Sequence, residues 1–319
     1  MPDPVWYNLR KSRADPPGLA GSDAVRRGIY TSGLHQFDEL FGAARQVTAA
    51  SRPLLIYYGL SQGGRSIVAA HGADMAYGTH GLSRPSVSLG ITKMAVEPKA
   101  TGAFPSVCKA IGSPIPTGAV ELGAAWGAIP DLWGTRLPQS SWPRALPFDP
   151  IQEGGYLLSV NATAAVIFDE EPTKETLPGV LDSYPTTTGW VPGLPDSGVR
   201  ASESGFELRL AWQAAGQGSE SDRMARLREV APEYRFRGQH WLRPVLGGVQ
   251  IHPLMAWWAL LYMLSILARY HPAEWLAALN LDASPLAVPL DDALEEALEA
   301  VPHLVLEAIL QDQVLLRST

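Results

Sequence analysis

The amino-acid sequence predicts an α+β fold that is mainly α, with a helical core built from the two ends of the chain around a β-containing insertion. Two long apolar stretches, residues 51–70 and 253–275, lie near opposite ends of the chain. Between them prolines become frequent and short strand-like runs appear. We therefore expect an extended arm over 1–35, a helical core over 36–82 and 247–319, and a β-containing insertion over 83–246.

Size, charge and cysteine content restrict the class of protein. A chain of 319 residues with 46% hydrophobic residues can bury a large core. A net charge of −7 argues against a surface that is basic overall, but a local basic patch is compatible with it. The single cysteine, Cys108, excludes an internal disulfide and is typical of a reducing compartment. No signal peptide is evident, so we expect a cytoplasmic protein.

The N-terminal part of the chain predicts an arm followed by two helices. Residues 1–35 are rich in Pro, Gly, Arg and Asp and show little periodicity, which favours an arm lying over the surface. His35–Ala49 has apolar residues at the spacing of an amphipathic helix. Ser51 can cap a second helix, and Pro53 suits its first turn.

The second helix carries glycines that favour close helix packing. Gly59 and Gly63 lie four residues apart, so they would form a groove that another helix could approach. The segments 53–70 and 254–270 both have wide apolar surfaces. We expect these two helices to pack on each other.

The middle of the chain mixes strand-like and helical segments. Residues 206–212 alternate between apolar and polar side chains, as expected for a half-buried strand. The complete set of expected elements is strands within 86–96, 156–168 and 206–212, short helices at 119–126 and 219–230, and an exposed loop at 182–204.

The C-terminal part predicts further helices. Pro253 suits a helix start, and Pro272 both ends that helix and begins a short one. Asp291 opens another helix, which we expect Pro302 to divide into two pieces. The apolar stretch 254–268 suits a buried core helix better than a membrane span, so we expect no membrane partner.

A Ser-x-x-x-Arg spacing occurs in both apolar stretches, as Ser61 with Arg65 and as Ser265 with Arg269. On a helix this spacing places both side chains on one face. Such arginines either pin helix packing through a buried pair or line a pocket for an anion. The residues of the candidate ligand site are Ser61, Gln62, Arg65, Ser265 and Arg269.

Arg269 is also a candidate for a structural role. It stands at the end of an apolar helix, shortly before Glu274 and Trp275. The sequence predicts that Arg269 is mostly buried and that these two residues fold back over its guanidinium.

Two segments resemble the YaaC-like family of bacterial proteins. They read Ser-Arg-Pro-Leu-Leu-Ile-Tyr-Tyr-Gly-Leu-Ser-Gln-Gly-Gly-Arg (51–65) and Leu-Ser-Ile-Leu-Ala-Arg-Tyr-His-Pro-Ala-Glu-Trp (264–275). This resemblance implies a bacterial, soluble, intracellular protein and specifies no activity.

The first segment is also similar to a helix of HEPN domains, many of which are metal-independent ribonucleases in phage defence or toxin systems. That similarity implies an Arg–His pair separated by four to six residues. Arg65 with His71 and Arg235 with His240 fit the spacing and are the candidate catalytic residues. On a continuous helix, however, Arg65 and His71 would lie on different faces.

Other chemistry finds less support in the sequence. Gly-Leu-Ser61-Gln-Gly matches the nucleophile elbow of serine esterases, but that pattern requires a strand before the serine, and this segment has helical spacing. No metal-ligand spacing and no glycine-rich nucleotide loop occur, so we expect no metal and no cofactor.

Arginines and aromatic residues also alternate within 223–243, as single-stranded nucleic acid prefers, although a solvated helix and strand would show the same composition. Together these features favour an interaction or effector protein of a bacterial conflict or stress system, such as defence against phage. RNA or an anionic small molecule is its expected ligand, and a protein partner or a homodimer is compatible with the sequence. A metal-independent ribonuclease and a serine esterase are the alternatives, and the sequence does not decide whether the protein is an enzyme.

Overall fold

The computed structural model divides the chain into two compact units, described here in turn. The first contains residues 1–142 and 246–314, and the second contains 143–245. The residues described are 3–75, 77–138, 141–151, 162–168, 170–173, 175–187, 190–192, 200–202, 205–212, 221–222, 225, 234, 240–312 and 314.

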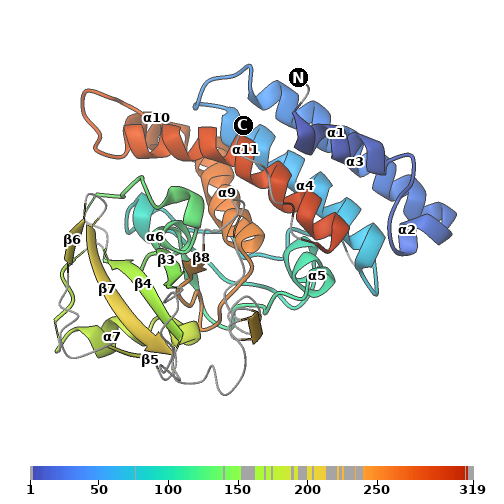
Figure 1. Ribbon diagram of the computed structural model, residues 1–319. Coiled ribbons are helices and arrows are strands. Elements are labelled where there is room, and N and C mark those ends of the chain that lie inside the picture. Colours follow the sequence, from blue (N-terminus) through green and yellow to red (C-terminus); the bar gives the residue numbers. More distant parts are fainter. Residues whose placement is uncertain are drawn as a thin grey trace. The chain divides into compact units, whose positions relative to one another are not determined.

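The first unit is helical and is built from both ends of the chain, as the sequence predicts. Helices α3, α4 and α11 lie side by side, and α9 also packs on α4 (Figure 1). The helices of this unit are α1 (Pro4–Ser12), α2 (Leu19–Ser22), α3 (Ala24–Ala44), α4 (Arg52–His71), α5 (Ala103–Ala110), α6 (Leu122–Gly127), α9 (Pro253–Tyr270), α10 (Pro272–Ala278) and α11 (Ala287–Leu310). A short antiparallel pair, β1 (Ala95–Val96) and β2 (Val120–Glu121), and the 3-10 turns η1 (Ile91–Lys93) and η2 (Pro130–Leu132) complete it.

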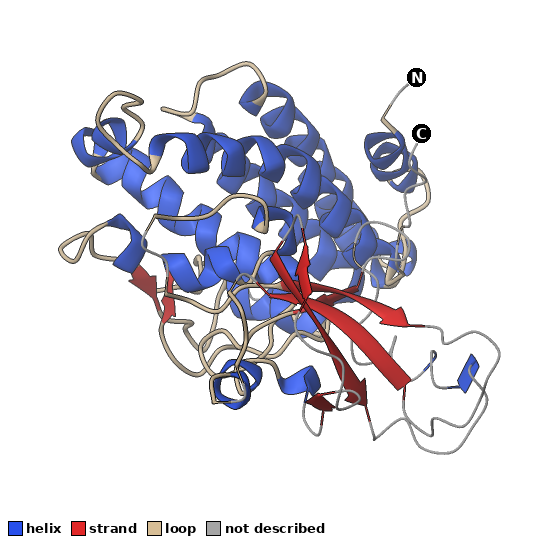
Figure 2. Cartoon of the chain, turned by 60° about the vertical axis from the view of Figure 1, so that its left-hand side comes forward, coloured by secondary structure: helices blue, strands red, loops and turns tan. Residues whose placement is uncertain are grey.

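The second unit contains an antiparallel sheet, whose strands are red in Figure 2. Its strand order is β5-β7-β4-β3-β8, and β6 pairs with β7. The elements are β3 (Leu146–Ile151), β4 (Ala162–Phe168), α7 (Leu177–Leu181), η3 (Pro185–Thr187), β5 (Trp190–Pro192), β6 (Arg200–Ser202), β7 (Gly205–Trp212) and β8 (His240–Leu242). The expected strand at 206–212 is confirmed as β7, which begins one residue earlier.

The expected extended arm over 1–35 is wrong, because this segment is largely helical. Asp3 accepts a hydrogen bond from the amide of Val5 at 2.8 Å, which caps α1 ahead of Pro4. Trp6 then packs against Phe37 of α3, with ring centroids 5.2 Å apart. The high content of Pro, Gly, Arg and Asp in this segment therefore concealed three helix signals. They are an N-cap, a first-turn proline and apolar side chains with helical spacing.

The expected insertion starts too early in the sequence. Residues 83–142 belong to the helical unit, in which α5 packs on α4. Most of the expected strand at 86–96 is irregular, and only Ala95–Val96 is extended. The helix expected at 119–126 is largely α6. Most of 219–230 lies outside the described residues.

The expected loop at 182–204 contains β5, β6 and buried side chains at Tyr184 and Thr187. Its described part is therefore more ordered than a simple surface loop. The tyrosine hydroxyl bonds the carbonyl of Arg144 within the same unit.

The expected packing of 53–70 on 254–270 is confirmed as the contact between α4 and α9. Trp258 lies directly against Gly64, where any Cβ atom would collide with its ring. Tyr57 adds an aromatic contact to Tyr262, at 5.3 Å between centroids. The predicted glycine groove serves other helices, since Gly59 faces Phe41 of α3 and Gly63 faces Val305 of α11.

Arginines on the first two long helices bond the carbonyls at helix ends. Arg26 donates to the carbonyl of Gly72 at 2.9 Å and reaches those of Val68 and Ala69 at the end of α4. Arg52, which is buried, donates to the carbonyls of Ala44 and Val47 at the end of α3. Carbonyls at the end of a helix lack the intrahelical donors that earlier carbonyls have, so each arginine helps to cap a neighbouring helix.

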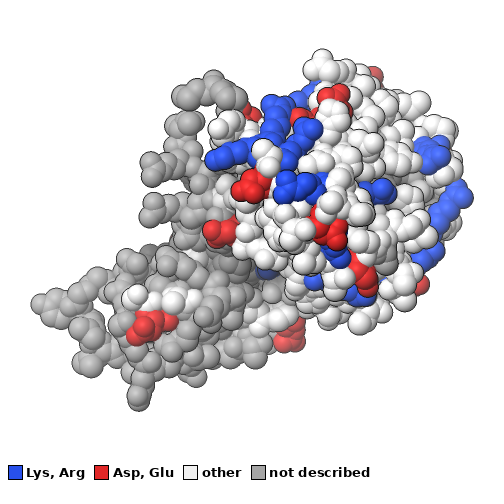
Figure 3. Space-filling view, turned by 90° about the vertical axis from the view of Figure 1, so that its right-hand side faces the viewer, with Lys and Arg blue, Asp and Glu red and all other residues white. Residues whose placement is uncertain are grey.

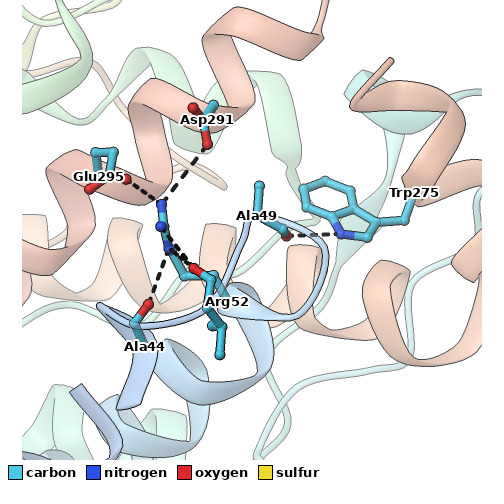
Figure 4. A network of polar contacts seen from close by, with 7 residues as sticks. Ala44, Ala49, Arg52, Trp275, Asp291 and Glu295 are labelled. Carbon is cyan, nitrogen blue, oxygen red and sulfur yellow. Dashed lines mark hydrogen bonds and ion pairs between the residues drawn. The ribbon is translucent and has the colours of Figure 1, made fainter. Parts of the chain in front are cut away.

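Arg52 also joins α3 and α4 to α11. Its guanidinium points at the carboxylates of Glu295 and Asp291, the latter at 3.9 Å (Figure 4). Trp275 of α10 donates its indole N–H to the carbonyls of Ala49 and Ala50 beside the same loop. Helices α10 and α11, which are distant in sequence from this region, thus both contact the segment that joins α3 to α4.

The expected division of the last helix at Pro302 is wrong, because α11 runs through it. Proline has no N–H to offer the carbonyl four residues earlier, which is that of Leu298. Arg45 donates to this carbonyl at 3.3 Å. The helix therefore continues because a guanidinium from another segment takes the place of the missing donor.

Candidate functional site

The accessible stripe of α4 consists of Tyr58, Ser61, Gln62 and Arg65. Tyr58 and Arg65 are exposed and the two residues between them are half-buried, whereas most of the neighbouring positions on this helix are buried. Positions three, four and seven residues apart share one helix face. Tyr58 and Arg65 are thus about 10 Å apart along the helix axis.

Arg269 extends this stripe from the end of α9. Its guanidinium donates to the hydroxyl of Tyr58 at 2.8 Å and lies over the ring of Tyr270, 5.0 Å from the centroid. Arg84 lies over the same ring at 4.4 Å. Two exposed guanidinium groups therefore share one tyrosine.

A second arginine–tyrosine contact occurs at the other end of the stripe. Arg65 lies over the ring of Tyr77, 5.2 Å from its centroid. The hydroxyl of Tyr77 donates to the carbonyl of Ser61 at 2.6 Å, which holds the segment after α4 against the helix. Burial raises the pKa of Tyr77, so this hydroxyl remains a neutral donor.

His80 contacts two buried tyrosines, Tyr57 of α4 and Tyr262 of α9. The Nδ1 atom of His80 is 2.9 Å from the hydroxyl oxygen of Tyr57. The His80 ring also packs against Tyr262, with centroids 5.5 Å apart. Partial burial, and then the charge of Arg269, lower the pKa of His80, whereas burial raises the pKa of both tyrosines.

We call this set the arginine–tyrosine surface. It consists of Tyr58, Ser61, Gln62, Arg65, Tyr77, His80, Arg84, Arg269 and Tyr270. Among the described residues, no carboxylate lies within 4.0 Å of the guanidinium groups of Arg65, Arg84 or Arg269. The face drawn in Figure 3 carries Lys and Arg together with Asp and Glu. The arrangement can supply planar donors and aromatic rings to an anionic ligand.

The structure places four of the five predicted ligand residues on this surface. Ser61, Gln62 and Arg65 lie on the α4 stripe, and Arg269 is joined to it through Tyr58. Ser265 does not join them, because it is buried and its hydroxyl bonds the carbonyl of Tyr262 in its own helix.

The expected burial of Arg269 is wrong, because this residue is exposed. Trp275 does not cover it but bonds the carbonyls of the loop before α4. The Oε1 atom of Glu274 lies 3.9 Å from Nδ1 of His271 instead. Helix α9 ends at the surface, so the guanidinium extends into solvent beside two tyrosines.

The Arg65–His71 pair does not converge. The two residues lie on the continuous helix α4, and His71 bonds the carbonyl of Ile309 in α11 through Nε2 at 2.7 Å. Arg65 lies against Tyr77. His71 thus ties two helices together at the end of α4.

The second Arg–His pair is described only in part. Arg235 and most of the basic cluster at 223–243 lie outside the described residues. His240 is buried in β8, and its ring packs on Phe148 of β3 at 5.3 Å.

Ser61 does not have the setting of an esterase nucleophile. It lies in the middle of α4, whereas the pattern requires a turn between a strand and a helix. Among the described residues, no group of three or more His, Cys, Asp or Glu could hold a metal ion. Within the same residues, no helix is both long enough and apolar enough to cross a bilayer.

The sequence carried a signal for part of the surface and missed the rest. The 58–61–62–65 spacing is readable as one helix face, but only burial identifies that face as the accessible one. Tyr77, His80 and Arg84 lie in an irregular segment with no motif. Their position depends on contacts with α4 and α9.

Comparison with known proteins agrees with the resemblance found in the sequence. The sequence model of a family described as YaaC-like Protein matches residues 17–309. No curated protein and no solved structure matches the chain.

Proposed function

The chain belongs to the YaaC-like family, and we propose that it binds single-stranded RNA, or a smaller anionic ligand, through the arginine–tyrosine surface. As its biological role we propose an intracellular bacterial interaction or effector protein of a conflict or stress system, such as defence against phage.

The proposal rests on the surroundings of three exposed arginines. Arg65, Arg84 and Arg269 each lie against a tyrosine ring, and no described carboxylate is within ion-pair distance of them. In a chain of net charge −7 such uncompensated groups stand out. Guanidinium groups bind phosphate oxygens in a bidentate manner, and tyrosine rings stack on unpaired bases.

The extent of the surface favours RNA over a small anion. The Arg269–Tyr58 bond and Arg65 are separated by about two turns of α4, roughly 10 Å along the axis. One phosphate group cannot contact both ends of such a stripe. A single strand can place successive phosphates on the arginines and bases on the tyrosines.

The test is binding of a fluorescently labelled single-stranded RNA, followed by anisotropy at several salt concentrations with EDTA present. The double variant Arg84→Ala/Arg269→Ala should bind roughly 10–100-fold more weakly, as expected for lost charge-assisted hydrogen bonds. For this variant, the slope of log affinity against log salt concentration should be smaller in magnitude by about one to two. Competition by inorganic phosphate and by a mononucleotide distinguishes RNA from a small anion.

The matched control is Arg10→Ala/Arg27→Ala, which removes the same charge from α1 and α3. Arg10 pairs with Asp38, and Arg27 donates to the carbonyl of Gly21. This control should bind RNA like the parent. Equal weakening in both double variants, or no binding by the parent protein, would overturn the proposal. Gel analysis of the same RNA checks for cleavage, which the metal-independent ribonuclease alternative requires.

A further inference from the structure

His80 is held at the arginine–tyrosine surface by three elements. Its Nδ1 atom is 2.9 Å from the hydroxyl of Tyr57 on α4, and its ring lies 5.5 Å from that of Tyr262 on α9. Its backbone carbonyl accepts the amide of Phe104, in the first turn of α5, at 3.1 Å. The residue is nevertheless exposed, so the orientation of an accessible imidazole is defined.

The Tyr57 hydroxyl can partner both charge states of His80. Burial raises the pKa of Tyr57, so its proton stays in place at neutral pH. The hydroxyl can donate to Nδ1 of a neutral imidazole, which leaves the proton on Nε2, or accept from Nδ1–H of an imidazolium. In both states Nε2–H is a donor with no hydrogen-bond partner among the described residues.

The charges facing His80 disfavour its protonation in the free protein. Partial burial lowers its pKa, and the charge of Arg269 lowers it further. From α4 the facing titratable group is Tyr57, and from α9 they are Tyr262 and Arg269. The α5 contact is made by the backbone of Phe104. An anion bound beside Arg269 would reverse this balance, because it attracts a proton on the imidazole.

Resting on the proposed function, we propose that His80 is a further phosphate-binding residue of this surface and binds the RNA backbone as an imidazolium, so that RNA binding takes up a proton. Nε2–H and Nδ1–H are then both used, the first by a phosphate oxygen and the second by Tyr57. A phosphodiester is the ligand class that fits, since it is an anion throughout the range in which histidine titrates.

The sign of the pH dependence follows from linkage. The bound anion raises the pKa of His80 relative to the free protein, so the complex holds more protons. RNA affinity must therefore rise as the pH falls, by at most about tenfold per pH unit for one proton. Above the pKa in the complex the dependence disappears.

The experiment measures affinity between about pH 5 and 8 with a short oligouridylate that lacks terminal phosphates, because neither its diesters nor its bases titrate there. The parent protein should bind about tenfold more tightly at the acid end. The His80→Gln variant keeps a polar partner for Tyr57, but this side chain cannot be charged. Its RNA affinity should change by less than about twofold over the same pH range. His35→Gln, at an exposed histidine of α3, should keep the parent profile.

Calorimetry in two buffers of different ionisation enthalpy measures the proton uptake directly. Uptake by the parent and its loss in His80→Gln are expected. Tight binding with the same pH profile in both proteins would overturn the role of His80 and leave the proposed function intact. No RNA binding by the parent at any pH would overturn the proposed function itself.

Discussion

The arginines of the helical unit form two sets with opposite surroundings. Arg26, Arg45 and Arg52 donate to main-chain carbonyls at helix ends or beside a proline. Arg65, Arg84 and Arg269 are exposed and lie against tyrosine rings. The first set satisfies acceptors that the fold would otherwise leave unpaired, whereas the second set keeps donors available.

This difference separates structural from functional arginines. A guanidinium group has five N–H donors. Arg52 directs its donors to two carbonyls and two carboxylates, so a ligand would have to displace contacts that the fold needs. Among the described residues, Arg269 makes one hydrogen bond, to Tyr58, so it can bind a ligand without breaking contacts that the fold needs. The two sets should therefore respond to mutation in opposite ways.

The largest effect on stability is expected at Arg52. Arg52→Ala leaves the carbonyls of Ala44 and Val47 without a donor and removes the link to α11. The free energy of unfolding should fall by on the order of 2–4 kcal/mol. Urea denaturation measures it, with Arg10→Ala as the control, because an exposed pair such as Arg10–Asp38 contributes only about 0–1 kcal/mol. Similar losses in both variants would show that the contacts of Arg52 contribute no more to stability than an exposed ion pair does.

A smaller effect is expected from the contact between Arg45 and the helix interrupted by Pro302. Arg45→Met should lower stability by about 1–2 kcal/mol, because the Leu298 carbonyl loses its donor. In a Pro302→Ala background the alanine N–H bonds that carbonyl, so the same change should cost about 1 kcal/mol less. The ion pair to Glu299 and the contact with Trp6 are present in both backgrounds and cancel. A double-mutant cycle without coupling would refute this account of the continuous helix.

The smallest effect on stability is expected at Arg269. Arg269→Ala should change the free energy of unfolding by less than about 0.5 kcal/mol, because the side chain is exposed. The same variant should weaken RNA binding, and Arg269→Lys should not restore it fully, since lysine lacks the planar fork. Thermal melting and anisotropy on one preparation make the comparison. Loss of stability without loss of binding would move Arg269 into the structural set.

The helices were predictable where capping and periodicity agree. Pro53 lies in the first turn of α4 as expected, and Ser51 is its N-cap residue, although the Ser51 side chain makes no capping hydrogen bond. Pro272 marked the junction of α9 and α10. The same rules apply at Asp3 and Pro4, but the surrounding glycines and prolines concealed them. Pro302 was misleading, because the donor that compensates for it is Arg45, more than two hundred residues away in sequence.

The candidate site was predictable only in part. Gln62 and Arg65 share the α4 stripe with Ser61 because helix geometry is local. Ser265 and Arg269 have the same spacing, yet one is buried and the other exposed. Spacing relates residues within one helix and cannot specify what covers that helix.

The sequence by itself determined the helices of the two long apolar stretches and which residue types could bind an anion, because capping, periodicity and side-chain chemistry depend on neighbours along the chain. The tertiary structure decided which arginines are used up and which are available. An arginine is engaged where a carbonyl or carboxylate from another segment lies within hydrogen-bond distance, as at Arg52. It stays available where its neighbours are a tyrosine ring and solvent, as at Arg269. His80 and Arg84 join the surface for the same reason, since packing against α4 and α9 gives them their neighbours.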